Sequence, residues 1–242
     1  MKFVSWNIRQ GGGSKAEQIV QQLFDWNPDA VGLCEFQNSA ASQKMAKELR
    51  QIVLTNQMTT ESAKSRGKNF LFFASKAPVE MIASNDFLDS SGRWIHVKIG
   101  SLNVMQMHVP NRKMPNKSEF LDEVVRELAL YRDHQTLAFG DTNSARSGID
   151  GESNFFKSGC EEELWFERIA KNDWHDLWRK RNPDARRYTW YSPHNNGFRL
   201  DQLFATKSAE PLIENVEYCW GGGSREDNFS DHAAILFEAQ IS

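Results

Sequence analysis

The chain lacks the cysteine pattern of a disulfide-bonded or zinc-binding protein. Its three cysteines, Cys34, Cys160 and Cys219, are odd in number and widely separated, and no CxxC pair occurs. We therefore expect reduced thiols and a cytoplasmic location. Long apolar runs are also missing, since the strand-like start at residues 1–4 leads into no signal-peptide core and no segment resembles a membrane span. We expect a monomer that makes no contact with a membrane.

The chain has no strong excess of charge of either sign. It carries 29 Lys and Arg against 32 Asp and Glu, a formal net charge of −3. This balance gives no overall attraction to nucleic acid, so a polyanionic substrate would need a local basic patch. Aromatic residues, by contrast, are plentiful, with 8 Trp and 16 Phe. Some of them are therefore expected at a surface as well as in the core.

Apolar periodicity predicts an alternation of strands and helices. Strands are expected at 2–8, 30–34, 70–73, 94–97, 102–105, 136–139 and 188–191, and helices at 40–51, 117–131 and 162–171. A further helix, capped by Ser14 with Glu17 three residues later, is expected to end at Asn27. The strands at 70–73, 94–97 and 102–105 have the spacing of an antiparallel meander. Because no repeat or linker interrupts the chain, we expect one domain of two packed sheets with helices outside.

Acid, amide and imidazole side chains recur at the ends of the expected strands. Asn7 and Glu35 each close a short apolar run, Asp141 follows a buried strand, and the pair Asp231-His232 lies near the C-terminus. In such a sandwich the strand ends gather at one edge, where carboxylates distant in sequence can share one ion. Oxygen donors with a histidine beside them are typical of a metal-assisted site, which is what the sequence predicts here.

Asp201 is an independent indication of this site. It lies inside the apolar run 200–204, where an unpaired carboxylate costs several kcal/mol of desolvation. A histidine is its natural partner, and His232 is the best candidate. The remaining polar residues have an ordinary alternative each, as a turn, a cap or an exposed strand end: Asn7, Glu35, His108, Asp141, Asn143 and Asp231. If all of these alternatives were true, several polar residues would have to lie at the ends of apolar strands by chance.

Seven segments, in order along almost the whole chain, resemble the endonuclease/exonuclease/phosphatase superfamily, and within it the exonuclease III type of abasic-site endonuclease. They are FVSWNI (3–8), VGLCE (31–35), HVPN (108–111), GDTN (140–143), YTW (188–190), GFRLD (197–201) and SDH (230–232). The resemblance implies a four-layered α/β sandwich, two packed mixed β-sheets flanked by helices, as one catalytic domain over residues 1–242. It also implies a phosphodiesterase or phosphatase that uses Mg²⁺ or Mn²⁺.

Position by position, the resemblance implies a role for each motif residue. Glu35 would be a direct metal ligand, with Asn7 and Asp231 in or near the coordination shell. Asp141 would activate or orient the attacking water, and Asn143 would help to hold that water or the phosphate.

The remaining motif residues are implied to act on the phosphate. His232 would contact it, held in place by Asp201, and His108 would belong to the same catalytic set. Asn7, Asn111 and Arg112 are placed among the substrate-binding residues.

Three positions depart from the family pattern. Arg9 stands where an Asp or Asn is usual, and a guanidinium cannot ligate a cation, so we expect one tight ion rather than two and a phosphate-binding role for Arg9. Cys34 replaces a Gln before the metal-binding Glu35. His108 replaces the Tyr of abasic-site endonucleases and is more like deoxyribonuclease I and the branches that act on lipid phosphates.

Two groups of residues bear on substrate choice. Trp190, Phe198 and Leu200 fall where the resemblance places an apolar pocket for a base-less sugar, although a place in the core explains them equally well. Basic residues cluster in predicted loops near the motifs, where they could track a phosphate backbone instead of forming ordinary solvated surface: 64–68, 112–113, 179–181 and 186–187.

The sequence thus favours a Mg²⁺-dependent DNA phosphodiesterase, an abasic-site endonuclease with 3′ exonuclease or 3′ phosphatase activity. One alternative is hydrolysis of another phosphate ester, such as RNA, a nucleotide or a phospholipid head group. The other is a non-catalytic nucleic-acid-binding relative disabled by Arg9. The intact set of acidic, amide and imidazole residues argues against loss of catalysis.

Overall fold

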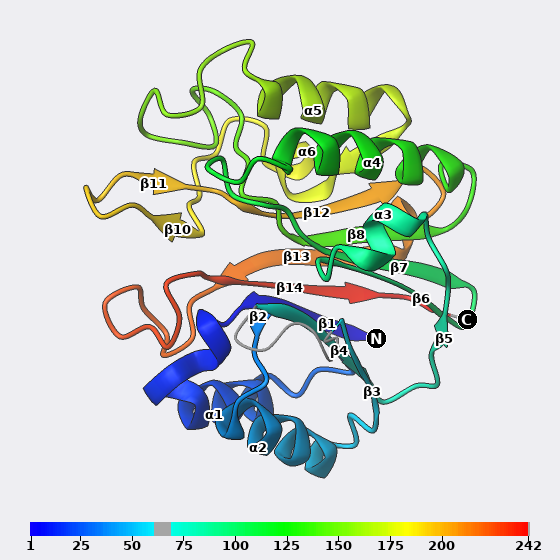
Figure 1. Cartoon of the computed structure of the whole chain (residues 1–242), viewed down its shortest axis with the longest axis vertical. Coiled ribbons are helices and arrows are strands. Elements are labelled where there is room, and N and C mark those ends of the chain that lie inside the picture. Colours follow the sequence, from blue (N-terminus) through cyan, green and yellow to red (C-terminus); the bar gives the residue numbers. More distant parts are fainter. Residues whose placement is uncertain (61–68, 242) are drawn as a thin grey trace.

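The apolar strand segments assemble into two mixed β-sheets that pack face to face, with helices on both outer sides (Figure 1). This computed structural model describes residues 1–60 and 69–241. The predicted four-layered α/β sandwich is confirmed. Within the described residues, every helix is too short or too polar to span a membrane.

The first sheet is built from both ends of the chain. Its strands run in the order β13-β14-β1-β2-β4-β3, and β1 and β2 at its centre are parallel while the other neighbours are antiparallel. The strands are β1 (Lys2–Asn7), β2 (Ala30–Phe36), β3 (Asn56–Thr59), β4 (Phe70–Ser75), β13 (Ile213–Cys219) and β14 (Ala234–Ala239). Because β14 lies beside β1, the two ends of the chain meet in one sheet (Figure 1).

The second sheet comes from the middle of the chain. Its order is β5-β6-β7-β8-β12-β9, again with one parallel pair, β7 and β8. The strands are β5 (Glu80–Met81), β6 (Trp94–Ile99), β7 (Leu102–His108), β8 (Thr136–Asp141), β9 (Trp174–Asp176) and β12 (Asp201–Thr206). A short hairpin of β10 (Trp190–Tyr191) and β11 (Gly197–Phe198) extends from one edge of the sandwich (Figure 1).

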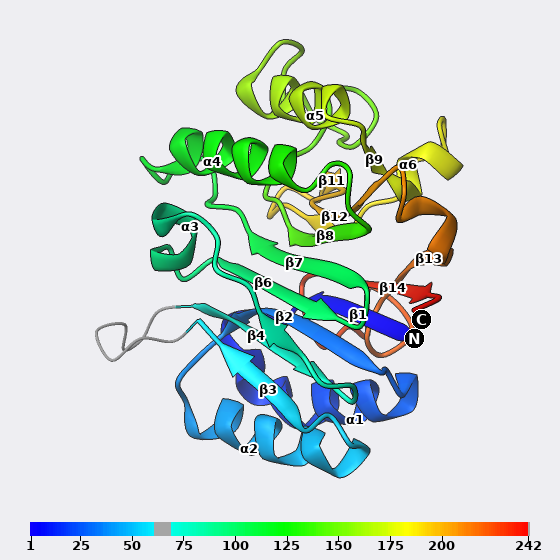
Figure 2. The same ribbon diagram turned by 90° about the vertical axis from the view of Figure 1, so that its right-hand side faces the viewer.

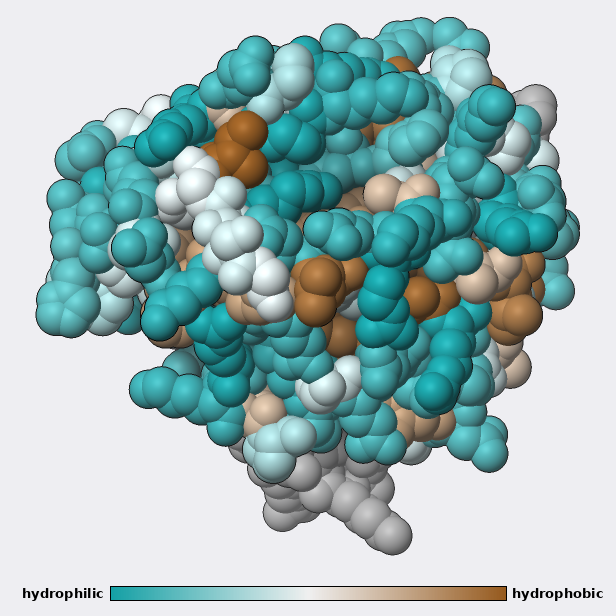
Figure 3. Space-filling model, turned by 90° about the horizontal axis from the view of Figure 1, so that it is seen from above, coloured by the Kyte–Doolittle hydropathy of each residue, from teal (hydrophilic) through white to brown (hydrophobic). Residues whose placement is uncertain are grey.

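Helices cover the outer face of each sheet (Figure 2). α1 (Ala16–Trp26) and α2 (Ala40–Leu49) lie on the first sheet, and α4 (Lys117–Leu130) and α5 (Glu161–Lys171) lie on the second. Two short α-helices, α3 (Asp86–Ser90) and α6 (Leu177–Arg181), are the other α-helices within the described residues. Seen from the α5 side, the surface is mainly hydrophilic, with apolar residues scattered among polar ones (Figure 3).

The central strands are continuous apolar runs because both of their faces are buried. In β1, Phe3 packs into the core between the sheets, while the next residue, Val4, packs under α1 and α2. In β7, Val104 and Met105 divide in the same way between the central core and the layer under α4 and α5. The alternation of side chains along a strand therefore fills three apolar layers, one at each junction of the sandwich.

Two local predictions are wrong. The strand at 70–73 belongs to β4, beside β2 in the first sheet, so the expected meander is reduced to the β6–β7 hairpin. The chain crosses to the second sheet after β4. The predicted cap at Ser14 is also absent, because residues 10–15 form a 3₁₀ segment in which three glycines have positive φ, and α1 begins only at Ala16.

A buried ion cluster ties the second sheet to the loop that follows β8. Arg199 is fully buried just before β12 and donates from Nε to Asp150 Oδ1 at 2.8 Å and from Nη2 to Asp176 Oδ2 at 2.6 Å. It also donates to the hydroxyl of Tyr218 at 3.1 Å, and Arg146 donates to both carboxylates. Burial alone would raise the pKa of Asp150 and of Asp176, but the charge of Arg199 lowers both, and it holds the pKa of Asp150 well below the usual range.

This cluster predicts a specific loss of stability in acid. The pKa of Asp150 is lower in the folded protein than its ordinary value of 3.8, so its stabilisation is complete above that value and is lost as the pH falls toward the folded pKa. Asp150→Asn should lower the free energy of unfolding by ~3 kcal/mol at pH 7, because it leaves Arg199 with one carboxylate fewer. The difference in unfolding free energy between wild type and Asp150→Asn should be smaller at pH 3 than at pH 7 by about 1 kcal/mol.

Urea unfolding at the two pH values measures both effects. Asp184→Asn, at an exposed aspartate, is the matched control and should unfold like wild type at both. A difference between wild type and Asp150→Asn that stayed constant from pH 7 to pH 3 would contradict the role assigned to the Asp150 charge.

Candidate active site

The strand register places three of the predicted residues side by side. His108 of β7 is paired with Asp141 of β8, and Asp141 is paired with Asp201 of β12. Neighbouring strands lie about 5 Å apart, so these side chains reach one edge of the second sheet together. Gly140 allows this close pairing, because its φ is +139° and a Cβ there would lie 1.9 Å from the carbonyl oxygen of Met107.

The first sheet supplies the facing side of the site. Asn7, at the end of β1, donates from Nδ2 to Asp141 Oδ2 at 2.9 Å and so joins the two sheets. The Ser230 hydroxyl donates to the carbonyl oxygen of Asn7 at 2.6 Å, which fixes the loop that carries Asp231 and His232. Residues from both ends of the chain thereby lie beside His108, Asp141 and Asp201 of the second sheet.

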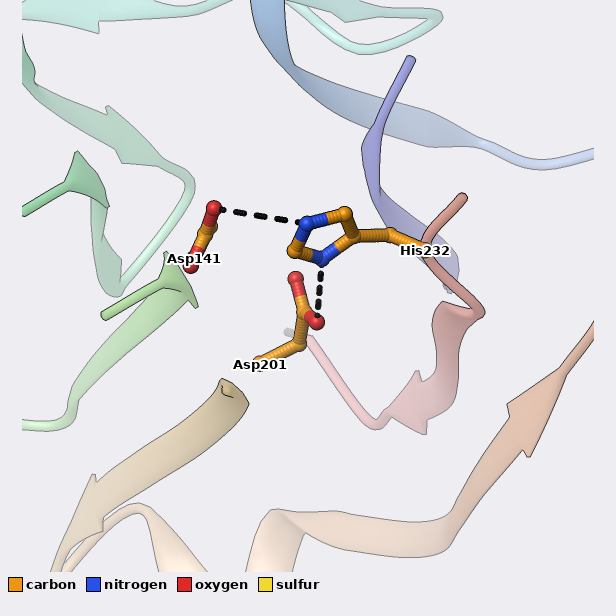
Figure 4. A group of neighbouring side chains, drawn as sticks. All are labelled: Asp141, Asp201 and His232. Carbon is orange, nitrogen blue, oxygen red and sulfur yellow. Dashed lines mark hydrogen bonds and ion pairs between the residues drawn. The ribbon is translucent and has the colours of Figure 1, made fainter. Parts of the chain in front are cut away.

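His232 lies between two buried carboxylates (Figure 4). Its Nδ1 is 2.9 Å from Asp201 Oδ2, and its Nε2 is 3.9 Å from Asp141 Oδ2. Burial opposes the charged imidazolium, but the charges of Asp201 and Asp141 outweigh it and raise the pKa of His232 to about 10. The pairing of Asp201 with His232 inferred from the sequence is present, and His232 is a cation at neutral pH.

Asp141 has a neutral histidine on its other side. His108 Nε2 is 3.7 Å from Asp141 Oδ2, and burial, followed by the positive charges of Arg93 and His232, lowers the pKa of His108 well below its usual range. Burial also raises the pKa of Asp141 to about 7, although His232 opposes this shift. A carboxyl group that titrates near neutrality can accept a proton from water under physiological conditions.

Asn143 is held in a strained conformation beside Asp141. Its φ is +46°, its backbone N–H donates to Asp141 Oδ1 at 2.9 Å, and its Nδ2 donates to the carbonyl oxygen of Val109 at 2.9 Å. Lys117, which is buried at the start of α4, donates from Nζ to the carbonyl oxygen of Asn143 at 2.7 Å and lies 3.5 Å from Glu162 Oε1. Sequence reasoning missed Lys117, although its place on the apolar face of α4, three residues before Phe120, was a signal.

Glu35 is turned into the site by a β-bulge. The register of β2 against β4 shifts between Leu33 and Phe36, and Glu35 has a φ of +61°. Its Oε2 accepts the backbone N–H of Gln10 at 2.8 Å, and its Oε1 lies 3.5 Å from Asn7 Nδ2. Such bulges re-aim side chains beside active sites, and a left-handed non-glycine residue persists only where the surrounding structure holds it.

Two sets of side chains have the chemistry to hold a cation. One ligand atom each from Asp141, Asp201 and His232 lie within 4.8 Å of one another. This trio is a poor metal site, however, because the protonated imidazole of His232 has no lone pair to offer. Glu35 and Asp231 are half-buried carboxylates that border one cavity, and they form the better oxygen donor set.

Asn7 and Arg9 flank this donor set. Asn7 Oδ1 accepts the backbone N–H of Arg9 at 3.0 Å, while its N–H groups face the carboxylates of Asp141 and Glu35. The side chain of Arg9 is 68% exposed, and its Nε lies 3.9 Å from Asp231 Oδ2. The guanidinium therefore lies in solvent beside Asp231.

A cavity of about 730 Å³ opens over these groups. Trp190, Phe198 and Leu200 line one side of it and pack with Phe156 in a small apolar cluster. They thus serve as a cavity wall and as local core at the same time. Sequence reasoning missed several other lining residues, among them Arg93, Phe155, Phe156, His194 and Asn196.

The predicted basic clusters are largely committed to contacts within the protein. Asn111 and Arg112 line the cavity, but Arg112 also donates to Glu162 Oε2 at 2.8 Å and to the carbonyl oxygen of Phe155. Arg179 donates to Asp150 at 2.6 Å and belongs to the buried ion cluster. The cluster at 64–68 lies outside the described residues.

Arg186 and Arg187 are nearer to a phosphate track, yet they too have partners. Arg186 donates to the carbonyl oxygen of Gly148 at 3.0 Å, and Arg187 donates to that of Tyr218 at 2.9 Å. Of the described basic residues named above, Lys113 and Arg9 are the best placed to meet a phosphate. Lys113 lines the cavity and donates from its backbone N–H to Asn111, while Arg9 is exposed beside Asp231.

The sequence and the fold were compared with those of known proteins. The sequence model of the endonuclease/exonuclease/phosphatase family matches residues 4–232. The chain is 24% identical over 274 aligned residues to exodeoxyribonuclease III of Haemophilus influenzae, covering 98% of this chain and 99% of that protein. Its fold is similar to that of an AP endonuclease from Archaeoglobus fulgidus, with a TM-score of 0.83 and 19% identity over the full length of both chains. It is also similar to the 3′ phosphatase NExo from Neisseria bound to a product DNA hairpin, with a TM-score of 0.77 and 18% identity over 99% of both chains.

Proposed function

The chain belongs to the endonuclease/exonuclease/phosphatase family, and we propose that it is a divalent-metal-dependent phosphodiesterase that acts on DNA in repair. Its preferred cut is at an abasic site, with 3′ exonuclease or 3′ phosphatase activity in addition. The similarity to an exodeoxyribonuclease III, an AP endonuclease and a DNA-bound 3′ phosphatase over nearly whole chains supports this proposal.

The observation that carries the proposal is the Asp201–His232–Asp141 cluster beside the cavity. Phosphodiester hydrolysis needs a group that activates water and a positive charge on the non-bridging phosphate oxygens. Asp141, with its raised pKa, is suited to take the proton from water. The imidazolium of His232, held by Asp201, is suited to bind a phosphate oxygen. His108, neutral and buried, lies against the Asp141 carboxylate on its other side, 3.7 Å away.

The donor set at Glu35 and Asp231 fits a hard divalent cation, Mg²⁺ or Mn²⁺, because both carboxylates border the cavity and keep oxygen lone pairs available. When bound, such an ion neutralises phosphate charge and promotes ionisation of water. Asn7 positions Glu35 and Asp141 through its amide. Arg9 beside Asp231 supplies a positive charge, which favours one bound ion and a guanidinium contact to phosphate.

A second candidate function is hydrolysis of a phosphate ester other than DNA: RNA, a nucleotide or a phospholipid head group. His108 beside Asp141 favours it, since a buried neutral histidine takes the place of the family's tyrosine. A non-catalytic role is the third candidate, and the assembled cluster of Asp141, Asp201 and His232 speaks against it.

A substrate panel tests the proposed function. Abasic duplex, intact duplex, single-stranded DNA, RNA and a small phosphate diester should each be incubated with Mg²⁺, with Mn²⁺ and with a chelator. We expect abasic duplex to be cut fastest, because no base has to be unstacked, and no cleavage with the chelator. Trp190→Ala should reduce the preference for abasic over intact duplex more than it reduces hydrolysis of the small diester. Faster hydrolysis of RNA or of the small ester, with no preference for abasic DNA, would favour the second candidate.

The metal site predicts the behaviour of Glu35→Gln. A neutral amide loses the charge that holds a hard cation, so most Mg²⁺ affinity should disappear while the fold is retained. Titration calorimetry of the protein without DNA measures this affinity and should show one ion per wild-type chain. Glu119→Gln, on the exposed side of α4, is the matched control and should bind like wild type. Unchanged Mg²⁺ binding by Glu35→Gln would remove Glu35 from the site.

The catalytic cluster predicts non-additive losses. Asp141→Asn and His232→Ala should each lower kcat by at least about a hundredfold, the usual effect of losing a base or a charge-stabilising group. Asp201→Asn acts through His232, so the double variant with His232→Ala should be little worse than His232→Ala alone. The exposed Asp25→Asn serves as a control. If the two losses multiplied in the double variant, Asp201 and His232 would not act as one unit.

A further inference from the structure

Phe155 is an exposed aromatic side chain inside the active-site cavity. Phe155 is 52% exposed. Few other large apolar residues within the described part of the chain are comparably exposed. The others, Val53, Met81, Leu130 and Leu164, are not among the residues that line the cavity. Ligand cavities are lined mainly by apolar and aromatic side chains, so an exposed ring in this cavity is placed to contact a ligand bound there.

The ring of Phe155 is held in place before any ligand arrives. It meets Phe156 edge-on with centroids 5.1 Å apart and Phe198 edge-on at 6.1 Å. The guanidinium of Arg112 lies 5.1 Å from the ring centroid, and Arg112 also donates to the carbonyl oxygen of Phe155. Arg112 lies over the ring and the residue is still 52% exposed, so ring surface that Arg112 leaves uncovered is open to a ligand.

The surroundings of this face combine aromatic and positive groups. Arg112 and Lys113 line the same cavity, as do Asp141 and His232 of the catalytic cluster. A planar, apolar partner that carries a phosphate fits this combination, and a nucleotide within a DNA strand has both features. Bases of any identity stack on aromatic side chains, and an arginine against the ring adds to the attraction.

We propose that Phe155 is a stacking platform for the nucleobase that flanks the cleaved phosphate. The platform rests on the proposed function, because it acts on the same DNA strand. It makes Phe155 a specificity-determining residue: it binds the base next to the cut and takes no part in the chemical step. The enzyme should therefore distinguish a flanking nucleotide that has a base from one that lacks it.

Binding to two matched DNA duplexes tests the platform. Both duplexes contain an abasic-site analogue. In one duplex the nucleotide beside the analogue carries the fluorescent base 2-aminopurine, and in the other that nucleotide is a base-free sugar. The pair is made twice, once for the 5′ neighbour and once for the 3′ neighbour. Affinities are measured in an Asp141→Asn background, so that the DNA stays intact, and kcat and KM are measured with wild-type Asp141. Phe155→Ala should weaken binding of the base-bearing duplex by about tenfold or more and abolish the quenching of 2-aminopurine.

Three comparisons make the result specific. The base-free duplex should bind Phe155→Ala within about twofold of the Phe155 protein, and kcat at saturation should be unchanged, as expected of a stacking contact. Phe155→Trp should keep the quenching, whereas Phe155→Leu, which retains apolar packing against Phe156 and Phe198, should lose it. Leu164→Ala, a comparably exposed residue of α5 at 46%, should behave like wild type on both duplexes.

The platform would be overturned if Phe155→Ala lost the same affinity for the two duplexes, or if quenching survived in Phe155→Leu and Phe155→Ala. Either result would leave the proposed function intact. Failure of the proposed function would be visible earlier, in a wild-type protein that neither binds nor cuts the abasic duplex with Mg²⁺.

Discussion

Arg199 is fully buried, and its charge can remain there only because two carboxylates surround it. The geometry of the site depends on this arrangement. Arg199 lies between the cavity-lining Leu200 and Phe198 in the sequence. The Tyr218 hydroxyl also accepts a hydrogen bond from Arg199 and donates in turn to the carbonyl oxygen of Asp201 at 2.8 Å. The cluster thereby fixes the start of β12 and one wall of the cavity. Without the guanidinium of Arg199, Asp150 and Asp176 would keep only the partly buried Arg146 and Arg179 as cationic partners within the described residues.

The two sheets contribute different electrostatics to the site. The second sheet provides the buried groups, Asp141 and Asp201, whose surroundings shift the pKa of Asp141 and of the His232 placed between them. The first sheet provides Glu35, which is half-buried and turned toward the cavity by a left-handed backbone. A buried pair suits proton transfer and a fixed charge, while a partly solvated carboxylate keeps lone pairs free for a cation. The division follows from which strand ends reach the cavity.

The sequence was sufficient to predict the fold and the residues that meet at the sheet edge, because apolar runs followed by polar residues mark strand ends. It was insufficient for sheet membership, which depends on pairing between distant segments, so β4 was assigned to the wrong hairpin. Arg199 was part of a quoted motif, but nothing in its neighbours indicated Asp150 and Asp176 as partners. Periodicity predicted that the face of α4 is buried, yet not that Lys117 on that face would bond the carbonyl oxygen of Asn143. Local patterns give burial, whereas partners require the assembled structure.

The order of the strands along the chain has a consequence for folding during synthesis. Every strand of the second sheet lies before residue 207, whereas the first sheet needs β13 and β14, and His232 lies two residues before β14. A growing chain can thus complete the sheet that carries His108, Asp141 and Asp201 while it still lacks the imidazole between the two aspartates. The carboxylates of Asp141 and Asp201 then lie close together without the imidazolium of His232 between them. Their mutual repulsion disfavours the state in which both are ionised. The catalytic cluster therefore depends on β14 being paired with β1, and a growing chain that has not reached residue 232 lacks the cluster.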